Sequence, residues 1–195
     1  MTNNPPFIVG IGGTTRPGSS SEKALRYALA LATAQGGEVE LFDGASINLP
    51  MYAPESAERS EGALRMVAAL RRANGVIIST PCYHGSVSGL VKNALDYTED
   101  MSKDPEPYLD GRAVGLIVCG SGWQTTAITL SALRSIVHAL RGWPTPMGVA
   151  INTMNKTFDE QGAVIEEAAA RQLGILVSQL VDFARLRCAQ AEEVR

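Results

Sequence analysis

The residues best suited to chemistry stand together near the start of the chain, in segment 8–21. An apolar run ends in glycines there, and a cluster of hydroxyl side chains with one arginine follows. A helix that begins after such a turn has unpaired N–H groups and partial positive charge at its first turn, so it can bind a phosphate. The side chains that would add donors are Thr14, Thr15, Arg16, Ser19, Ser20 and Ser21.

Two common phosphate motifs do not fit this spacing. The dinucleotide-binding fingerprint requires glycine or alanine where Thr15 stands, and the triphosphate-binding loop requires lysine where Ser19 stands. The pattern favours a single phosphate held by neutral donors and one arginine. A polar loop that only begins a helix, without a ligand, stays open as an alternative.

Length and composition limit the class of protein. The 195 residues predict one domain over 1–195, and a net charge of −3 argues against nucleic acid or an anionic membrane as partner. Cys82, Cys119 and Cys188 form no CxxC pair, so we predict neither a disulfide framework nor a metal site. Segment 1–7 lacks the features of a signal peptide and no apolar run has a membrane-spanning length, which predicts a cytoplasmic protein.

Strand and helix patterns alternate along the chain. Short apolar segments bounded by turn residues predict strands, and apolar residues at helical spacing predict helices between them. The predicted strands are 7–12, 38–42, 75–80, 112–119 and 147–151. The predicted helices are 20–35, 62–73, 86–100, 125–140 and 160–187.

This alternation predicts an α/β fold with a parallel, doubly wound sheet and helices on both faces. A five-stranded order, 2-1-3-4-5, competes with a six-stranded dinucleotide-binding order, and the number of strands favours the first. In both orders ligands bind at the carboxyl ends of the strands. We therefore expect the site in the loops after the first, third and fourth predicted strands.

Two more motifs lie near the third predicted strand. Pro81–Ser86 reads PCYHGS, and Lys92–Tyr97 reads KNALDY. With Gly13–Ser19, GTTRPGS, they resemble the motifs G-S-x-R-x-x-S, P-x-Y-[NH]-x-S and K-N-A-[IL]-D-[WY] of the NADPH-dependent FMN reductase family, whose members are flavodoxin-like flavoproteins. The resemblance covers nearly the whole chain. Threonine at position 14, where serine is usual, keeps the hydroxyl group.

The resemblance implies that the chain binds FMN and uses NAD(P)H. The residues that would hold the FMN phosphate are Thr14, Arg16, Ser19, Ser20 and Ser21. Those that would wrap the flavin ring and ribityl chain are Pro81, Cys82, Tyr83, His84, Gly85 and Ser86. Those that would line the other side of the ring are Ser121, Gly122 and Trp123. Trp123 would either stack near the flavin or pack against a neighbouring subunit. The resemblance also implies a homodimer or homotetramer formed through helices near the flavin, 90–100 and 125–140.

Hydride transfer to a flavin needs no protein nucleophile, so we predict no catalytic side chain. Cys82 and His84 could pair as nucleophile and base, but no third group that would orient them is evident. We predict an NAD(P)H-dependent FMN reductase that supplies reduced flavin to a partner monooxygenase. The alternatives are an FMN-containing reductase of quinones, azo dyes or metal oxyanions, a flavodoxin-type electron carrier, and a flavin-free binding protein. The sequence does not choose between NADPH and NADH; Arg16, Arg112 and Arg134 are unassigned candidates for binding a 2′-phosphate.

Overall fold

The computed structural model describes residues 5–193, so the first four residues of segment 1–7, on which the signal-peptide prediction rests, lie outside it. Within the described residues the parallel strands have the order β2-β1-β3-β5-β6, and β4 pairs antiparallel with β3. The strands are β1 (Phe7–Gly12), β2 (Glu38–Phe42), β3 (Gly75–Tyr83), β4 (Ser86–Val87), β5 (Ala113–Gly120) and β6 (Trp143–Asn152). The predicted order of five parallel strands is therefore confirmed.

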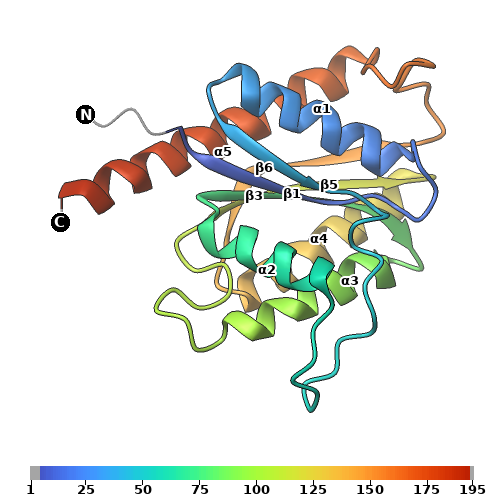
Figure 1. Cartoon of the computed structure of the whole chain (residues 1–195). Helices are drawn as coiled ribbons and strands as arrows, with labels where there is room; N and C mark the ends of the chain where they lie inside the picture. The colour runs from blue at the N-terminus through green and yellow to red at the C-terminus, as the bar shows by residue number, and fades with distance from the viewer. Residues whose placement is uncertain (1–4, 194–195) are drawn as a thin grey trace.

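Helices cover both faces of the sheet, as Figure 1 shows. The helices on one face are α1 (Ser20–Ala34) and α5 (Glu167–Glu193). Those on the other are α2 (Glu61–Arg72), α3 (Gly89–Asp96) and α4 (Trp123–Ala139), with a 3₁₀ helix, η1 (Tyr97–Met101), after α3. Val9 belongs to one apolar core and the adjacent Ile8 to the other. Successive residues of β1 are thus buried on opposite faces, which explains its continuous apolar run.

The predicted helix 86–100 is wrong at its start. His84 and Gly85 both have positive φ, +50° and +78°, and Tyr83 pairs directly with Ser86. This is the two-residue turn whose twist suits a β-hairpin. The chain returns along β3 as β4, and α3 begins only after Ser88, whose Oγ accepts a hydrogen bond from the N–H of Val91 (3.2 Å). The strand predicted over 75–80 accordingly extends to Tyr83.

The last strand and last helix also differ from prediction. β6 begins at Trp143 instead of residue 147 and contains Pro144 and Pro146. Proline is tolerated there because β6 is an edge strand, where a missing N–H need not break the sheet. The helix predicted from residue 160 begins at Glu167, because residues 158 and 164 form a β-bridge first. None of the described helices combines the length and apolar character needed to cross a membrane.

Backbone contacts bring the loops after four strands to one edge of the sheet. The N–H of Gly13 donates to the carbonyl of Ser79 (3.2 Å), and the Ser79 hydroxyl donates to the carbonyl of Ser21 (2.7 Å). The N–H of Thr153 donates to the carbonyl of Gly120 (2.9 Å). The loops after β1, β3, β5 and β6 therefore surround one region at the carboxyl ends of the strands.

Candidate functional site

Most hydroxyl groups of the β1–α1 loop are engaged in shaping the loop. The Thr14 hydroxyl donates to the carbonyl of Arg16 and accepts from its N–H, both at 3.1 Å. Ser19 caps α1, because its Oγ accepts from the N–H of Glu22 (3.4 Å), and it lies 3.4 Å from the Ser21 Oγ. Ser19 and Ser21 are buried. These residues fix the turn that leads into the helix.

Glu22 also shapes the loop, a role that the sequence analysis missed. Its carboxylate accepts hydrogen bonds from the N–H of Gly18 (3.0 Å) and from Nε of Arg26 (2.8 Å). Arg26 then donates to Asp43 (3.0 Å). Burial alone would raise the pKa of Asp43, but hydrogen bonds from Ser46 and the charge of Arg26 outweigh it and lower the pKa. The S-x-x-E spacing of a capped helix could have revealed Glu22.

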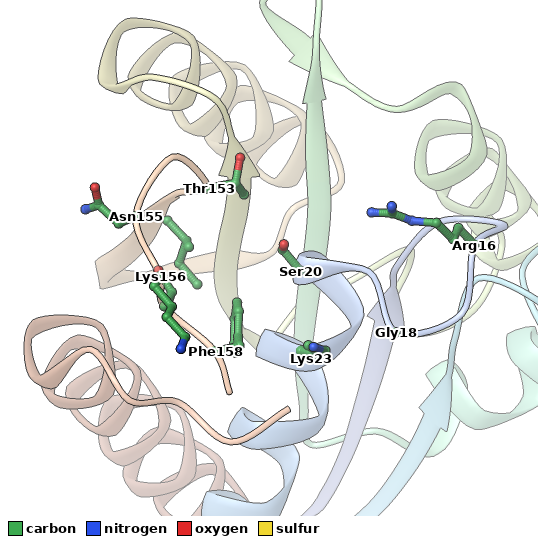
Figure 2. Close-up of a pocket in the computed structure, with 10 residues that line it drawn as sticks. Arg16, Gly18, Ser20, Lys23, Thr153, Asn155, Lys156 and Phe158 are labelled. Carbon is green, nitrogen blue, oxygen red and sulfur yellow. The ribbon is translucent and has the colours of Figure 1, made fainter. Parts of the chain in front are cut away.

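A cationic pocket of about 200 Å³ lies between this loop and the segment that follows β6 (Figure 2). Its lining contains three cations, Arg16, Lys23 and Lys156, and no carboxylate. The other lining residues are Gly18, Ser20, Ile151, Thr153, Asn155, Thr157 and Phe158. Nothing among residues 5–193 accepts a hydrogen bond from the amides of Ser20 and Ser21 in the first turn of α1. The donors in and beside the pocket suit an anion such as a phosphate.

The motif Pro81–Ser86 forms the β3–β4 hairpin. Pro81 is buried in the sheet, whereas Tyr83, His84 and Ser86 are exposed and Gly85 is half-buried at the turn. Burial raises the pKa of Cys82, although a hydrogen bond with Thr129 opposes this shift. Because the thiolate is the nucleophilic form, a raised pKa argues against Cys82 as a nucleophile at neutral pH.

The β5–α4 loop lies beside this hairpin. Gly122 has a φ of +115° with open space where a side chain would be, and its N–H donates to the Asn152 side chain (3.0 Å). Ser121 is exposed, and Trp123, the first residue of α4, is 58% exposed. The Thr129 hydroxyl of α4 donates to the carbonyl of Ser86 (3.4 Å). The two loops expected to flank the flavin ring are thus neighbours, and of the five predicted phosphate residues the pocket includes Arg16 and Ser20.

The KNALDY motif holds another loop in place. Asn93 accepts from the N–H of Tyr52 (2.8 Å), and its Nδ2 donates to the carbonyls of Leu49 (3.3 Å) and Pro50 (3.0 Å). The Tyr97 hydroxyl donates to the same Pro50 carbonyl (2.9 Å). The motif therefore clamps the long connection between β2 and α2, a positioning role that the sequence analysis did not assign.

The sequence analysis also missed Lys23, Thr153, Asn155 and Lys156 of the pocket. It considered the loops after three of the predicted strands and left out the loop after the last one. The rule that ligands bind at the carboxyl ends of parallel strands would have included that loop as well.

Comparisons with known proteins agree with the motifs. A sequence model described as NADPH-dependent FMN reductase matches residues 6–156. An NAD(P)H-dependent FMN reductase of Pseudomonas aeruginosa is 30% identical over 169 residues, which cover 83% of this chain and 86% of the relative. An FMN-dependent NADPH-azoreductase of Staphylococcus aureus is 29% identical over 178 residues, which cover 88% and 91%.

A solved structure supports the fold. FerB, a flavoenzyme NAD(P)H:(acceptor) oxidoreductase from Paracoccus denitrificans, superposes with a TM-score of 0.74 at 21% identity, over 93% of this chain and 98% of that one. The family match itself spans well over half of the sequence and contains the β1–α1 loop and the β3–β4 hairpin. The chain therefore belongs to the NADPH-dependent FMN reductase family, whose members are oxidoreductases.

Proposed function

We propose that this protein is an NAD(P)H-dependent FMN reductase whose β1–α1 loop binds the phosphate of FMN. The single observation that carries the proposal is the cationic pocket, in which Arg16 and Ser20 of the family motif stand beside a helix N-terminus. In this proposal Thr14, Ser19 and Ser21 act mainly by shaping the loop, because their hydroxyl groups already have partners in the chain.

The flavin ring is proposed to lie against the β3–β4 hairpin and the β5–α4 loop. Tyr83 and Trp123 offer exposed aromatic faces, 53% and 58% exposed, and Gly122 leaves room for a close approach. A bound FMN would supply the group that accepts hydride from the nicotinamide. The backbone of Tyr83–Ser86 would orient the ring edge, and Pro81 and Cys82 would support it from the strand. The protein contributes position and electrostatics, without a nucleophilic side chain.

The electron acceptor is a finer part of the proposal. In one form reduced FMN leaves and serves a partner monooxygenase. In the second candidate form the flavin stays bound, and quinones, azo dyes or metal oxyanions accept the electrons. The Staphylococcus aureus relative, named as an FMN-dependent azoreductase, favours the second form. FMN that remains bound through purification would support the second form, and FMN that is consumed as a weakly bound substrate would support the first.

We also propose that the protein works in the cytoplasm as a homodimer or homotetramer. Exposed apolar side chains support this, because Tyr83, Trp123 and Ile128 are each at least half exposed and lie on the neighbouring hairpin and α4. Such side chains at neighbouring positions are typical of a surface that a partner covers. Trp123 would then lie at the border between the flavin and the second subunit.

The experiment is an FMN titration followed by stopped-flow reduction with NADPH and NADH in parallel. Wild-type protein is expected to bind FMN and to reduce it with at least one of the two nicotinamides. Arg16→Met should weaken FMN binding about tenfold or more, because it removes a charge-assisted hydrogen bond to the phosphate. Riboflavin, which lacks the phosphate, should bind both proteins equally. Failure of the wild type to bind FMN, or equal losses for both flavins, would overturn the proposal.

A further inference from the structure

The segment that follows β6 is a folded wall of the cationic pocket. The Thr157 hydroxyl donates to the Glu166 carboxylate (2.7 Å), and the N–H of Ile165 donates to the Thr157 carbonyl (2.9 Å). Phe158 pairs with Val164 in a β-bridge. These contacts hold residues 153–158 as a defined structure before α5 begins.

This wall is fastened to the opposite side of the pocket. Nζ of Lys23, on α1, donates to the carbonyl of Asp159 (3.4 Å) and lies 6.0 Å from the centre of the Phe158 ring. On the β5 side, the Asn152 carboxamide accepts hydrogen bonds from the N–H groups of Gly122 (3.0 Å) and Met154 (3.1 Å). The segment therefore keeps a fixed distance from both α1 and the β5–α4 loop.

Lys156 gives this wall its charge. Its side chain is exposed, and it forms no ion pair with any carboxylate in the described part of the chain. Figure 2 shows Lys156 across the pocket from Arg16, with Ser20 between the two segments. The two cations thus belong to segments about 140 residues apart, so the charge is created by the tertiary fold (156 − 16 = 140).

The pocket matches a phosphate group in size and chemistry. Its volume of about 200 Å³ exceeds several times the ~30 Å³ that one water molecule occupies in the liquid. A phosphate monoester with a few waters therefore fits. Three cations without a carboxylate in the lining would favour a dianion over a neutral ligand.

We propose that Lys156 completes a phosphate-monoester site together with Arg16 and Ser20. Two ligands of the proposed reaction carry this group, FMN as its 5′-phosphate and NADPH as its 2′-phosphate. The identity of the ligand rests on the proposed function, whereas the anion site itself does not. The family match ends at residue 156, so the residues that hold Lys156 in place, 157–166, lie beyond the part shared with the family.

The test compares full-length wild-type protein with Lys156→Gln and with Lys103→Gln, a control at an exposed lysine outside the pocket. Four ligands are measured: dissociation constants for FMN and riboflavin by flavin fluorescence, and KM values for NADPH and NADH. Lys156→Gln should weaken one phosphorylated ligand about tenfold, as loss of one charge-assisted contact does, and leave its unphosphorylated counterpart unchanged. An effect confined to FMN assigns the site to the flavin phosphate, and one confined to NADPH assigns it to the 2′-phosphate.

An independent readout uses inorganic phosphate alone. Added phosphate should raise the Tm of the wild type and of Lys103→Gln more than chloride at equal ionic strength, and Lys156→Gln should lose most of that difference. The inference is overturned if Lys156→Gln matches the wild type in all these measurements, or if it weakens phosphorylated and unphosphorylated ligands alike. If the wild type binds no flavin and oxidises no nicotinamide, the proposed function fails, and the phosphate measurement still decides for or against the anion site.

Discussion

Gly44 controls how closely two loops approach each other. A Cβ atom at this position would lie 1.8 Å from the carbonyl oxygen of Thr14, so the backbone after β2 rests directly on the β1–α1 loop. The contact is to backbone atoms, which cannot move aside as the end of a flexible side chain can. The shape of the proposed phosphate loop therefore depends on a residue outside its own motif.

Gly44→Ala should destabilise the protein by ~1–3 kcal/mol, because the methyl group forces the two loops apart. FMN affinity should fall with it, since the donors of the loop are displaced. Urea unfolding and an FMN titration measure the two effects. Gly89→Ala is the control, because no atom lies within 4 Å of its added Cβ, and it should be neutral or slightly stabilising. Equal stability of the two variants would contradict the prediction.

At the scale of elements, the connection between β2 and α2 is fastened to α3 and η1. Arg59 makes two hydrogen bonds to the carboxylate of Asp100, at 2.7 and 2.8 Å, and its guanidinium lies 4.9 Å from the centre of the Tyr52 ring. Asn93 holds the same connection from α3. Figure 1 shows this long loop extending away from the sheet beside α2 and α3. Its order depends on a few polar contacts more than on burial.

Asn93→Asp tests the clamp on this loop. The carboxylate can still accept from Tyr52, but it cannot donate to the carbonyls of Leu49 and Pro50, and it repels them. We expect a loss of ~1–3 kcal/mol in urea unfolding and faster proteolysis within residues 49–60. Lys92→Gln, on the exposed side of the same helix, should cost no more than ~0.5 kcal/mol. Unchanged proteolysis in Asn93→Asp would contradict the clamp.

Asp100 predicts how this region responds to acid. Hydrogen bonds from Arg59 lower its pKa in the folded protein, although burial opposes this shift. The stabilisation is therefore fully present above the unfolded pKa of about 3.9 and is lost as the pH falls through the lower folded value. Asp100→Asn should lower the Tm by roughly 2–4 °C at pH 7, and its difference from the wild type should shrink below about pH 4. A difference that stays constant from pH 7 to pH 3 would contradict this account.

At the scale of the whole molecule, the proposed assembly depends on one apolar surface, formed by Tyr83, Trp123 and Ile128. Ile128 is 50% exposed on α4, and its Cγ2 would lie 3.6 Å from a Cβ atom added at Gly85 of the hairpin. The surface therefore joins α4 to the loop proposed to hold the flavin. Assembly and cofactor binding would share this part of the molecule.

Ile128→Glu places a charge in the centre of this surface and should convert the oligomer to monomers, because a buried unpaired carboxylate is costly. Light scattering coupled to size-exclusion chromatography measures the mass. Leu64→Glu is the control, since Leu64 is similarly exposed (58%) but lies on α2, outside the surface. An oligomer that persists in Ile128→Glu would exclude this surface as the interface.

The sequence predicted the parallel sheet well because its strands are continuous apolar runs, and Val9 and Ile8 need no distant information to indicate burial on both faces. The hairpin at His84 and Gly85 was missed because its strand β4 has only two residues, too short for periodicity to detect. Lys156 could not be recognised as a pocket residue, since a lysine in a polar loop usually lies in solvent. Only the tertiary fold shows that it faces Arg16.

The strand order also has a consequence for how the chain emerges during synthesis. β1 lies between β2 and β3, and the N–H of Phe7 bonds to the side chain of Asn74, 67 residues later. A ribosome that adds ~5–20 residues per second needs roughly 3–13 s to cover that separation. During this interval one edge of an apolar strand has no partner. We therefore expect the nascent chain to be most vulnerable to aggregation, and most dependent on chaperones, before β3 has left the ribosome.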